Sequence, residues 1–156
     1  CRIATHYKSA LKEAFEVNPN AKEIIILEDD LIVSPDFMAY VAQLIDVLHL
    51  DKTIFCISAW NDQGYTHSTG HRSMLYRVQT MPGLGWVLKR DLFEKELLPK
   101  WPPKFVYFDW DMWIRQKHIL KNRECVIPDL SRSLHIGNKG VNVHPGFQRA
   151  YFSKKS

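Results

Sequence analysis

The sequence predicts an α/β fold in which a mixed sheet is flanked by helices. Apolar residues recur at helical spacing over Tyr7–Val17, and a short strand with a wholly apolar centre follows at Lys22–Leu27. The same order returns with a helical pattern over Phe37–His49 and an apolar strand over Thr53–Ala59. A helix followed by such a strand is half of an α/β unit. Strands without polar alternation are typical of parallel or mixed sheets.

Length and composition fit one ordinary globular domain. The chain has 156 residues, of which 46% are hydrophobic and 24% are charged, and this is enough for one hydrophobic core. The net charge is +4, and the basic residues are scattered apart from Lys154 and Lys155. This distribution excludes the basic stripe of a nucleic-acid-binding protein. No apolar run approaches the roughly 20 residues that span a bilayer.

Turn and capping residues delimit the first elements. Asn18-Pro19-Asn20 ends the first helix. Ser34-Pro35-Asp36 predicts the start of the second helix, with Ser34 as the cap, Pro35 at the first position and an acid in the first turn. Asp51-Lys52 predicts the turn before the second strand.

The second half of the chain predicts shorter elements. A polar loop follows Ala59 and reaches Arg72. Gly83 and Gly85 surround an apolar centre, which indicates backbone that approaches another group closely. The other predicted elements are a strand at Leu75–Val78, a short helix that opens at Arg90–Phe93 and ends before Pro99, a helical stretch at Asp109–Lys117, strands at Cys125–Pro128 and Ser131–Ile136, and a flexible loop at Gly137–Gly146.

Three adjacent carboxylates, Glu28-Asp29-Asp30, follow the first apolar strand directly. At the end of a buried strand they repel one another and each costs solvation, unless a cation compensates. A hard divalent ion suits oxygen ligands and could in turn hold a diphosphate. Strand alternation places Glu28 and Asp30 on one side and Asp29 on the other. We predict Asp30 as the metal ligand and Glu28 near a nucleotide sugar; the alternative is a solvated acidic strand end.

A second acidic group is Asp109-Trp110-Asp111-Met112-Trp113. Its carboxylates could simply favour the dipole of the helix that follows. The two neighbouring indoles suggest instead a partly dry pocket, in which desolvation raises the pKa of a carboxylate and makes it a usable general base. The residues themselves leave both interpretations open.

Cysteine, tryptophan and histidine give weaker signals. Cys56 and Cys125 both lie in apolar runs, which fits either two buried thiols or one disulfide. No cysteine–histidine cluster has zinc spacing. We expect the tryptophans to be mainly core residues, although some could stack on a sugar or a base. His135 and the loop histidines are interpreted as incidental.

Several motifs occur in a fixed order along the chain: Leu27–Leu31, Ser58–Gly64, Met81–Trp86, Lys100–Pro102, Asp109–Trp113 and Ile127–Ser133. In this order they resemble glycosyltransferase family 13, and the resemblance runs over nearly the whole chain. That family contains the β-1,2-N-acetylglucosaminyltransferase of N-glycan branching and the one that acts on protein O-linked mannose. Gln63-Gly64-Tyr65 and the spacing of Asp109–Trp113 look closer to the O-mannose enzyme, whereas Gly140-Val141 looks closer to the N-glycan enzyme. The acceptor therefore stays open.

The resemblance implies a GT-A-type nucleotide-diphospho-sugar transferase fold, UDP-GlcNAc as the donor and manganese as the metal. The family's metal-binding acid falls on Asp30. Its acid that contacts the sugar nucleotide falls on Glu28, with Asp29 beside it in the same donor site. The catalytic base corresponds to Asp111, and Trp110 lines the donor pocket.

The resemblance also implies features outside the acidic motifs. The family's disulfide maps onto Cys56 and Cys125, and its substrate-ordered loop onto the stretch after Ile136. The family has an N-terminal strand that builds much of the uridine site and precedes the equivalent of Cys1. The chain also begins without an initiator methionine or a signal peptide. We therefore expect residues 1–156 to be a partial GT-A catalytic domain that lacks this strand, has an exposed sheet edge and binds donor weakly alone.

The expected function is inverting, metal-dependent transfer of GlcNAc from UDP-GlcNAc to the 2-hydroxyl of a mannose on a glycoprotein glycan. We expect a type II membrane protein of the Golgi lumen, anchored through a segment outside this chain, with no nucleic-acid partner. The competing hypothesis is a non-catalytic carbohydrate-binding module or pseudoenzyme that stacks sugar on tryptophans. A metal-dependent phosphohydrolase is disfavoured, because no further paired acids supply a second metal site.

Overall fold

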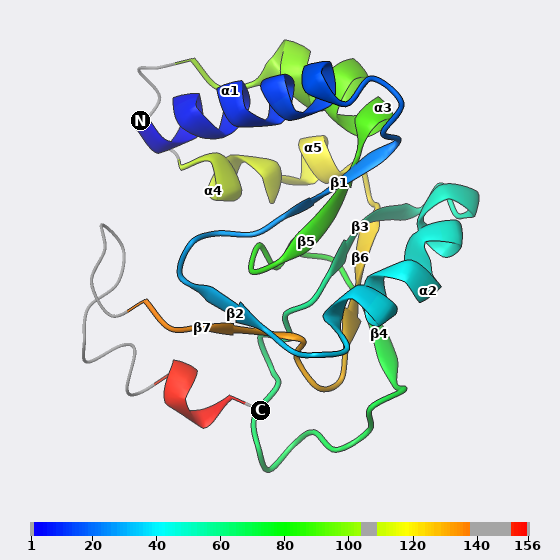
Figure 1. The fold of residues 1–156 in the computed structure, drawn as a ribbon, viewed down its shortest axis with the longest axis vertical. Coiled ribbons are helices and arrows are strands. Elements are labelled where there is room, and N and C mark those ends of the chain that lie inside the picture. The colour runs from blue at the N-terminus through cyan, green and yellow to red at the C-terminus, as the bar shows by residue number, and fades with distance from the viewer. Residues whose placement is uncertain (1, 104–108, 138–150, 156) are drawn as a thin grey trace.

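The computed structural model describes residues 2–103, 109–137 and 151–155, which form a mixed sheet with helices on both faces (Figure 1). The strands of the main sheet are β1 (Glu23–Ile26), β3 (Ile54–Ser58), β4 (Leu75–Val78), β5 (Trp86–Lys89) and β6 (Glu124–Pro128). Their order is β1-β5-β3-β6-β4. β3 and β6 run parallel, and the other neighbours are antiparallel. The predicted α/β class with a mixed sheet is confirmed.

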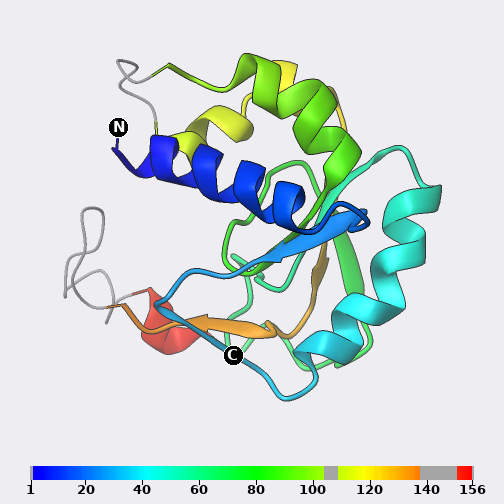
Figure 2. The same ribbon diagram turned by 45° about the horizontal axis from the view of Figure 1, so that its top comes forward.

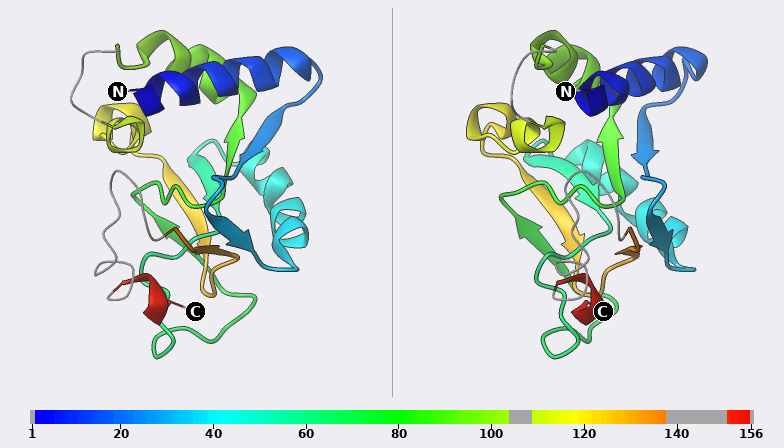
Figure 3. Two further views of the ribbon diagram at one scale, coloured as in Figure 1. Left: turned by 60° about the vertical axis from the view of Figure 1, so that its left-hand side comes forward. Right: turned by 90° about the vertical axis from the view of Figure 1, so that its left-hand side faces the viewer.

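Helices pack on each face of this sheet (Figures 2 and 3). One face carries α1 (Arg2–Val17), α3 (Arg90–Leu92), the helical turns η1 (Phe93–Leu97) and η2 (Leu98–Lys100), α4 (Trp110–Ile114) and α5 (Lys117–Leu120); the other carries α2 (Phe37–Leu50). Trp86 and Leu88 belong to the first core and Val87 to the second, as strand alternation requires. In the described part of the chain, no helix is both long and apolar enough to cross a bilayer.

Two helix starts differ from the prediction. α1 begins at Arg2 rather than at Tyr7, because Ala4 is buried and its carbonyl accepts a hydrogen bond from the Trp101 indole at 3.0 Å. The prediction of Ser34 as the cap of α2 was wrong, since that helix begins at Phe37 after Asp36. Ser34 donates its hydroxyl hydrogen bond to the Asp36 carboxylate instead, at 2.6 Å. Tertiary contacts therefore moved both boundaries.

Two helix ends also differ. The helical run from Arg90 continues through Pro99, which lies in the first turn of η2, where a missing N–H costs nothing. The stretch predicted as one helix over Asp109–Lys117 is divided, because the backbone becomes extended at Gln116 before α5 begins. The helical period detects the apolar positions but not this break.

β1 is an edge strand, and its outer side borders a groove. It pairs with β5 on one side, and only Ile26 of its four residues is fully buried. The groove has a volume of about 1120 Å³ and is lined by residues of α1, β1 and α2. The wholly apolar centre of β1 therefore lines a groove as well as a core, at an edge of the sheet that the described residues form.

A separate two-stranded ribbon extends from the end of β1. β2 (Leu31–Val33) pairs antiparallel with β7 (Ser133–His135), and Leu31 lies opposite His135. The backbone N–H of Ile136 donates to the Asp30 carbonyl at 2.9 Å, which continues the pairing by one step. β2 was not predicted, and β7 is shorter than the predicted Ser131–Ile136. The predicted loop Gly137–Gly146 lies outside the described residues after Gly137.

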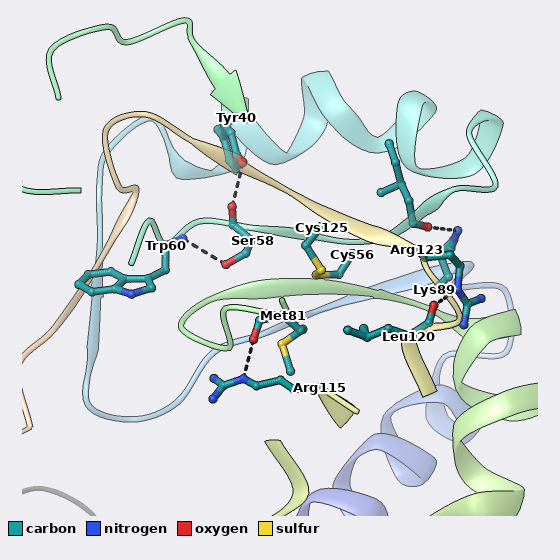
Figure 4. The surroundings of a disulfide bond; sticks show 11 residues. Tyr40, Cys56, Ser58, Trp60, Met81, Lys89, Arg115, Leu120, Arg123 and Cys125 are labelled. Carbon is teal, nitrogen blue, oxygen red and sulfur yellow. Dashed lines mark hydrogen bonds between the residues drawn. A yellow bond between two sulfur atoms is a disulfide. The ribbon is translucent and has the colours of Figure 1, made fainter. Parts of the chain in front are cut away.

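Cys56 of β3 and Cys125 of β6 form a disulfide between parallel strands, with their Cα atoms 4.7 Å apart (Figure 4). The pairing implied by the family resemblance is confirmed. Because the bond closes a loop of 69 residues, replacing both cysteines by alanine is expected to lower the free energy of unfolding by about 2–4 kcal/mol. Urea unfolding measures this, with Cys1→Ala as the control. An unchanged unfolding midpoint in the double variant contradicts it.

Candidate functional site

The acidic triplet forms the turn between β1 and β2. The Leu31 N–H donates to the Glu28 carbonyl at 3.3 Å, which closes the turn. Glu28 and Asp30 are half-buried and Asp29 is exposed. All three line the end of the groove beside β1. Glu28 and Asp30 are thus more buried than Asp29, but they lie in a turn rather than in a strand, so strand alternation does not apply to them.

Asp30 is held in a confined position. Its Oδ2 lies 3.0 Å from Nε2 of His135. Its Oδ1 is buried and has no hydrogen-bond partner among the described residues, although the side chain as a whole is 36% exposed. A Cβ atom on Gly137 would lie 2.5 Å from Oδ2, so only glycine leaves room for this carboxylate. A buried, unpaired carboxylate oxygen is costly unless a cation or donor approaches it.

His135, interpreted from the sequence as incidental, contacts the predicted metal ligand. Its side chain is 7% exposed, pairs with Asp30 and lies 4.5 Å from the Phe152 ring, measured between centroids. Phe152 belongs to the short helical turn η3 (Phe152–Lys154). Alternation along β7 puts Ser133 and His135 on the inner side. The alternation could suggest that His135 is buried. Only the pairing of β7 with β2 shows that its imidazole contacts Asp30.

Glu28 connects the acidic turn to α1. Its Oε1 accepts a hydrogen bond of 2.6 Å from the Tyr7 hydroxyl. Burial raises the pKa of the Glu28 carboxyl above its ordinary value, and the hydrogen bond from Tyr7 opposes this shift. The negative charges of Asp30 and Asp111 raise this pKa further, while His135 lowers it. The pKa of Glu28 therefore depends on the charges of both acidic groups.

Asp111 reaches the same neighbourhood from α4. Its Oδ2 lies 3.3 Å from the Arg115 guanidinium one helical turn later. The Arg115 Nε donates to the Met81 carbonyl at 3.0 Å, which ties α4 to the turn before β5 (Figure 4). Asp109 precedes the helix as its N-cap residue. Tyr7 donates a hydrogen bond to Glu28 and stacks on Trp110, which directly precedes Asp111, so the structure brings the two predicted acidic groups near each other.

Trp110 is packed between two aromatic rings. The Tyr7 ring stacks on it at a centroid distance of 3.9 Å, and the Trp86 ring lies 6.1 Å away. Tyr7 also lines the groove, so it stands between the groove and Trp110. The role of Trp110 in lining a donor pocket stays a prediction. The tryptophans are core residues as expected, since each is at most 7% exposed: Trp60, Trp86, Trp101, Trp110 and Trp113.

The side chains around Asp30 that could coordinate a metal suit a cation that also binds ligands from the substrate. Among the described residues, no group of three or more histidine, cysteine, aspartate or glutamate side chains could hold a metal by itself. Asp30, with its buried Oδ1, and His135 supply two candidate ligands. Magnesium-like ions are often bound by one or two carboxylates together with substrate phosphates. The residues present therefore fit a hard divalent ion that is shared with a diphosphate.

Comparison with known proteins agrees with this arrangement. The sequence matches the GNT-I family over residues 1–155. It is also 38% identical over 148 residues to alpha-1,3-mannosyl-glycoprotein 2-beta-N-acetylglucosaminyltransferase of Arabidopsis thaliana. That match covers 95% of this chain and 32% of the relative, so the chain spans about a third of that protein's length. The chain belongs to the GNT-I family.

Proposed function

We propose that this chain forms part of a GT-A-type catalytic domain that transfers GlcNAc from UDP-GlcNAc to the 2-hydroxyl of a mannose on a glycoprotein glycan. The observation that carries the proposal is the meeting of two acidic groups that are distant in the sequence. Glu28 and Asp30 lie in the turn after β1, beside the groove. Tyr7 donates a hydrogen bond to Glu28 and stacks on Trp110, which directly precedes Asp111 at the start of α4. One group suits a metal-bound donor, and the other suits a general base.

The groove and the acidic turn would bind the donor. Asp30, with its buried and unpaired Oδ1, is the proposed manganese ligand, and His135 lies beside it. Manganese bound there would neutralise charge on the diphosphate. Glu28 would accept a hydrogen bond from the donor sugar, and the exposed Asp29 at the groove's end would contact the sugar nucleotide.

Asp111 would act as the base. It accepts the proton of the mannose 2-hydroxyl while that oxygen attacks the anomeric carbon of GlcNAc, and the bond from this carbon to the diphosphate breaks on the opposite side. A single displacement inverts the anomeric centre, so no carboxylate nucleophile is needed. The ion pair with Arg115 engages Oδ2 of Asp111. Its Oδ1 makes no hydrogen bond with a described residue and is the oxygen that would take the proton.

Two observations favour a particular acceptor and compartment. The Arabidopsis relative is named for an alpha-1,3-mannosyl-glycoprotein acceptor, and we propose mannose of an N-glycan as the acceptor. The buried Cys56–Cys125 disulfide supports an oxidising compartment, and within the secretory pathway we propose the Golgi lumen. Membrane attachment of a type II protein would then come from a segment outside the described residues.

A transfer assay on the full-length protein tests the proposed function. UDP-GlcNAc is offered with an N-glycan mannose acceptor and with an O-mannose peptide, each with and without manganese. The expected result is manganese-dependent formation of a β-1,2 linkage, preferentially on the N-glycan. Glycan binding without transfer and without manganese-dependent UDP affinity would establish the binding module instead. The structure disfavours that module because no tryptophan presents an open ring face.

Gly137→Ala is expected to weaken donor binding without unfolding the protein. The new methyl group would lie 2.5 Å from Asp30 Oδ2 and 3.1 Å from the His135 ring, so the carboxylate must move. We expect the affinity for UDP-GlcNAc in the presence of manganese to fall about tenfold or more, as for other changes beside a metal ligand. Calorimetry measures this. The matched control is Gly70→Ala, whose Cβ meets nothing within 4 Å; equal affinities of the two variants contradict the prediction.

A further inference from the structure

Tyr7 joins the two acidic groups of the candidate site. It lies in α1, lines the groove and donates its hydroxyl hydrogen bond to Glu28 Oε1 at 2.6 Å. Its ring stacks on Trp110 at a centroid distance of 3.9 Å with an interplanar angle of 22°. Trp110 directly precedes Asp111 at the start of α4. One side chain thus contacts the acid at the end of β1 and the residue beside the proposed base.

The hydrogen bond has a defined direction. Burial, followed by the hydrogen bond to Glu28 and the charges of Glu28, Asp111 and Asp30, holds the pKa of the Tyr7 phenol far above its ordinary value, so the hydroxyl stays protonated and donates. Glu28 Oε1 is therefore occupied. The other oxygen, Oε2, makes no hydrogen bond with a residue in the described part of the chain, although Glu28 lines the groove. Oε2 is the oxygen left to accept a hydrogen bond from a ligand.

The hydroxyl of Tyr7 is not needed to anchor α1. Leu11 and Phe15 of this helix belong to the core. The Arg90 guanidinium donates to the Phe15 carbonyl at 2.9 Å, and the Trp101 indole donates to the Ala4 carbonyl at 3.0 Å. These contacts hold both ends of the helix. Losing the Tyr7 hydroxyl alone should therefore leave α1 in place.

We propose that Tyr7 is a positioning residue of the donor site. Its hydroxyl fixes the Glu28 carboxylate so that Oε2 accepts a hydrogen bond from a hydroxyl or amide of the donor sugar. Its ring supports Trp110 and, through it, the position of Asp111. The inference rests on the proposed function, because it takes the ligand to be a nucleotide sugar. It adds a residue that orients Glu28 for contact with the sugar rather than with the nucleotide.

Tyr7→Phe in the full-length protein tests this role, because it removes the hydroxyl and keeps the stacked ring. The matched control is Tyr40→Phe, which removes another buried hydroxyl, donated to the Ser58 carbonyl at 2.8 Å on the opposite face of the sheet. Calorimetry with manganese compares UDP with UDP-GlcNAc. We expect Tyr7→Phe to weaken UDP-GlcNAc about tenfold and to leave UDP unchanged. Tyr40→Phe should change neither affinity.

Steady-state kinetics supply the second readout. Tyr7→Phe should raise the KM for UDP-GlcNAc about tenfold with little change in kcat, because the base keeps its position. Tyr7→Leu, which also removes the stacked ring, should lower kcat as well. Unchanged UDP-GlcNAc affinity in Tyr7→Phe, or equal losses for UDP and UDP-GlcNAc, would overturn the inference while the proposed function stands. A wild-type protein that neither binds UDP-GlcNAc with manganese nor transfers GlcNAc would overturn both.

Discussion

Asp111→Asn is expected to abolish GlcNAc transfer while donor binding stays intact. The amide has nearly the shape of the carboxylate but cannot accept a proton from the acceptor hydroxyl. Base assistance of this kind is worth roughly 100- to 10,000-fold in rate, so initial rates with UDP-GlcNAc should fall by that factor. Calorimetry should find the manganese-dependent affinity for UDP-GlcNAc unchanged, because Asp111 lies outside the residues that line the groove beside β1.

The matched control for this variant is Asp91→Asn. Asp91 also lies in the first turn of a helix and pairs with a basic residue four positions later, with 3.1 Å between its Oδ2 and Lys95 Nζ. It is exposed and lies outside the candidate site. Asp91→Asn also removes an ion pair at a helix start, but it should leave the rate of GlcNAc transfer unchanged. Wild-type activity of Asp111→Asn would remove Asp111 from the role of base, and Asp109 would be the next residue to test.

Asp30→Ala is expected to remove manganese-dependent binding of UDP-GlcNAc. The variant loses the carboxylate whose Oδ1 is buried without a hydrogen-bond partner among the described residues. We expect the affinity for UDP-GlcNAc measured with manganese to fall about 100-fold or more. Replacing a residue that only supports a metal ligand already costs about 10- to 100-fold in metal affinity, and losing the ligand itself should cost at least as much. Thermal stability should change little, because the lost contact with His135 is offset by the relief of repulsion from Glu28 and of the unpaired buried Oδ1.

The control for Asp30→Ala is Asp46→Ala, which removes an exposed carboxylate of α2. A second comparison omits manganese. Wild type and Asp30→Ala should then bind UDP-GlcNAc with the same weak affinity, because the variant affects only the part of the affinity that depends on the metal. If Asp30→Ala keeps the affinity of wild type in the presence of manganese, Asp30 is not the metal ligand.

Local signals predicted most of the fold. The helical period over Tyr7–Val17 and Phe37–His49 located α1 and α2, and the apolar run Thr53–Ala59 located β3. Gly85 was expected to allow a close approach. It adopts a positive φ of 80°, and a Cβ there would lie 3.4 Å from the side chains of Leu27 and Ser133. These features depend on residues near one another in the sequence, so a periodic pattern or a single glycine can predict them.

The rest of the site depends on contacts between distant segments. The acidic triplet was recognised because charge follows an apolar strand, but nothing local indicates that β2 pairs with β7 and brings His135 to Asp30. Tyr7 was overlooked for a similar reason. It lies four residues before Leu11 on the apolar side of α1, so its spacing is that of a core residue. Only the tertiary structure shows that its hydroxyl meets Glu28.

The central claim is that the turn after β1 holds a manganese–diphosphate pair within reach of Asp111. A crystal structure of the full-length protein with manganese and UDP-GlcNAc tests it most directly, because anomalous scattering locates the metal. The account predicts the metal peak within coordination distance of Asp30 and the donor diphosphate, with the anomeric carbon on the side of Asp111. A metal peak elsewhere, with the donor bound away from Glu28 and Asp30, would contradict it.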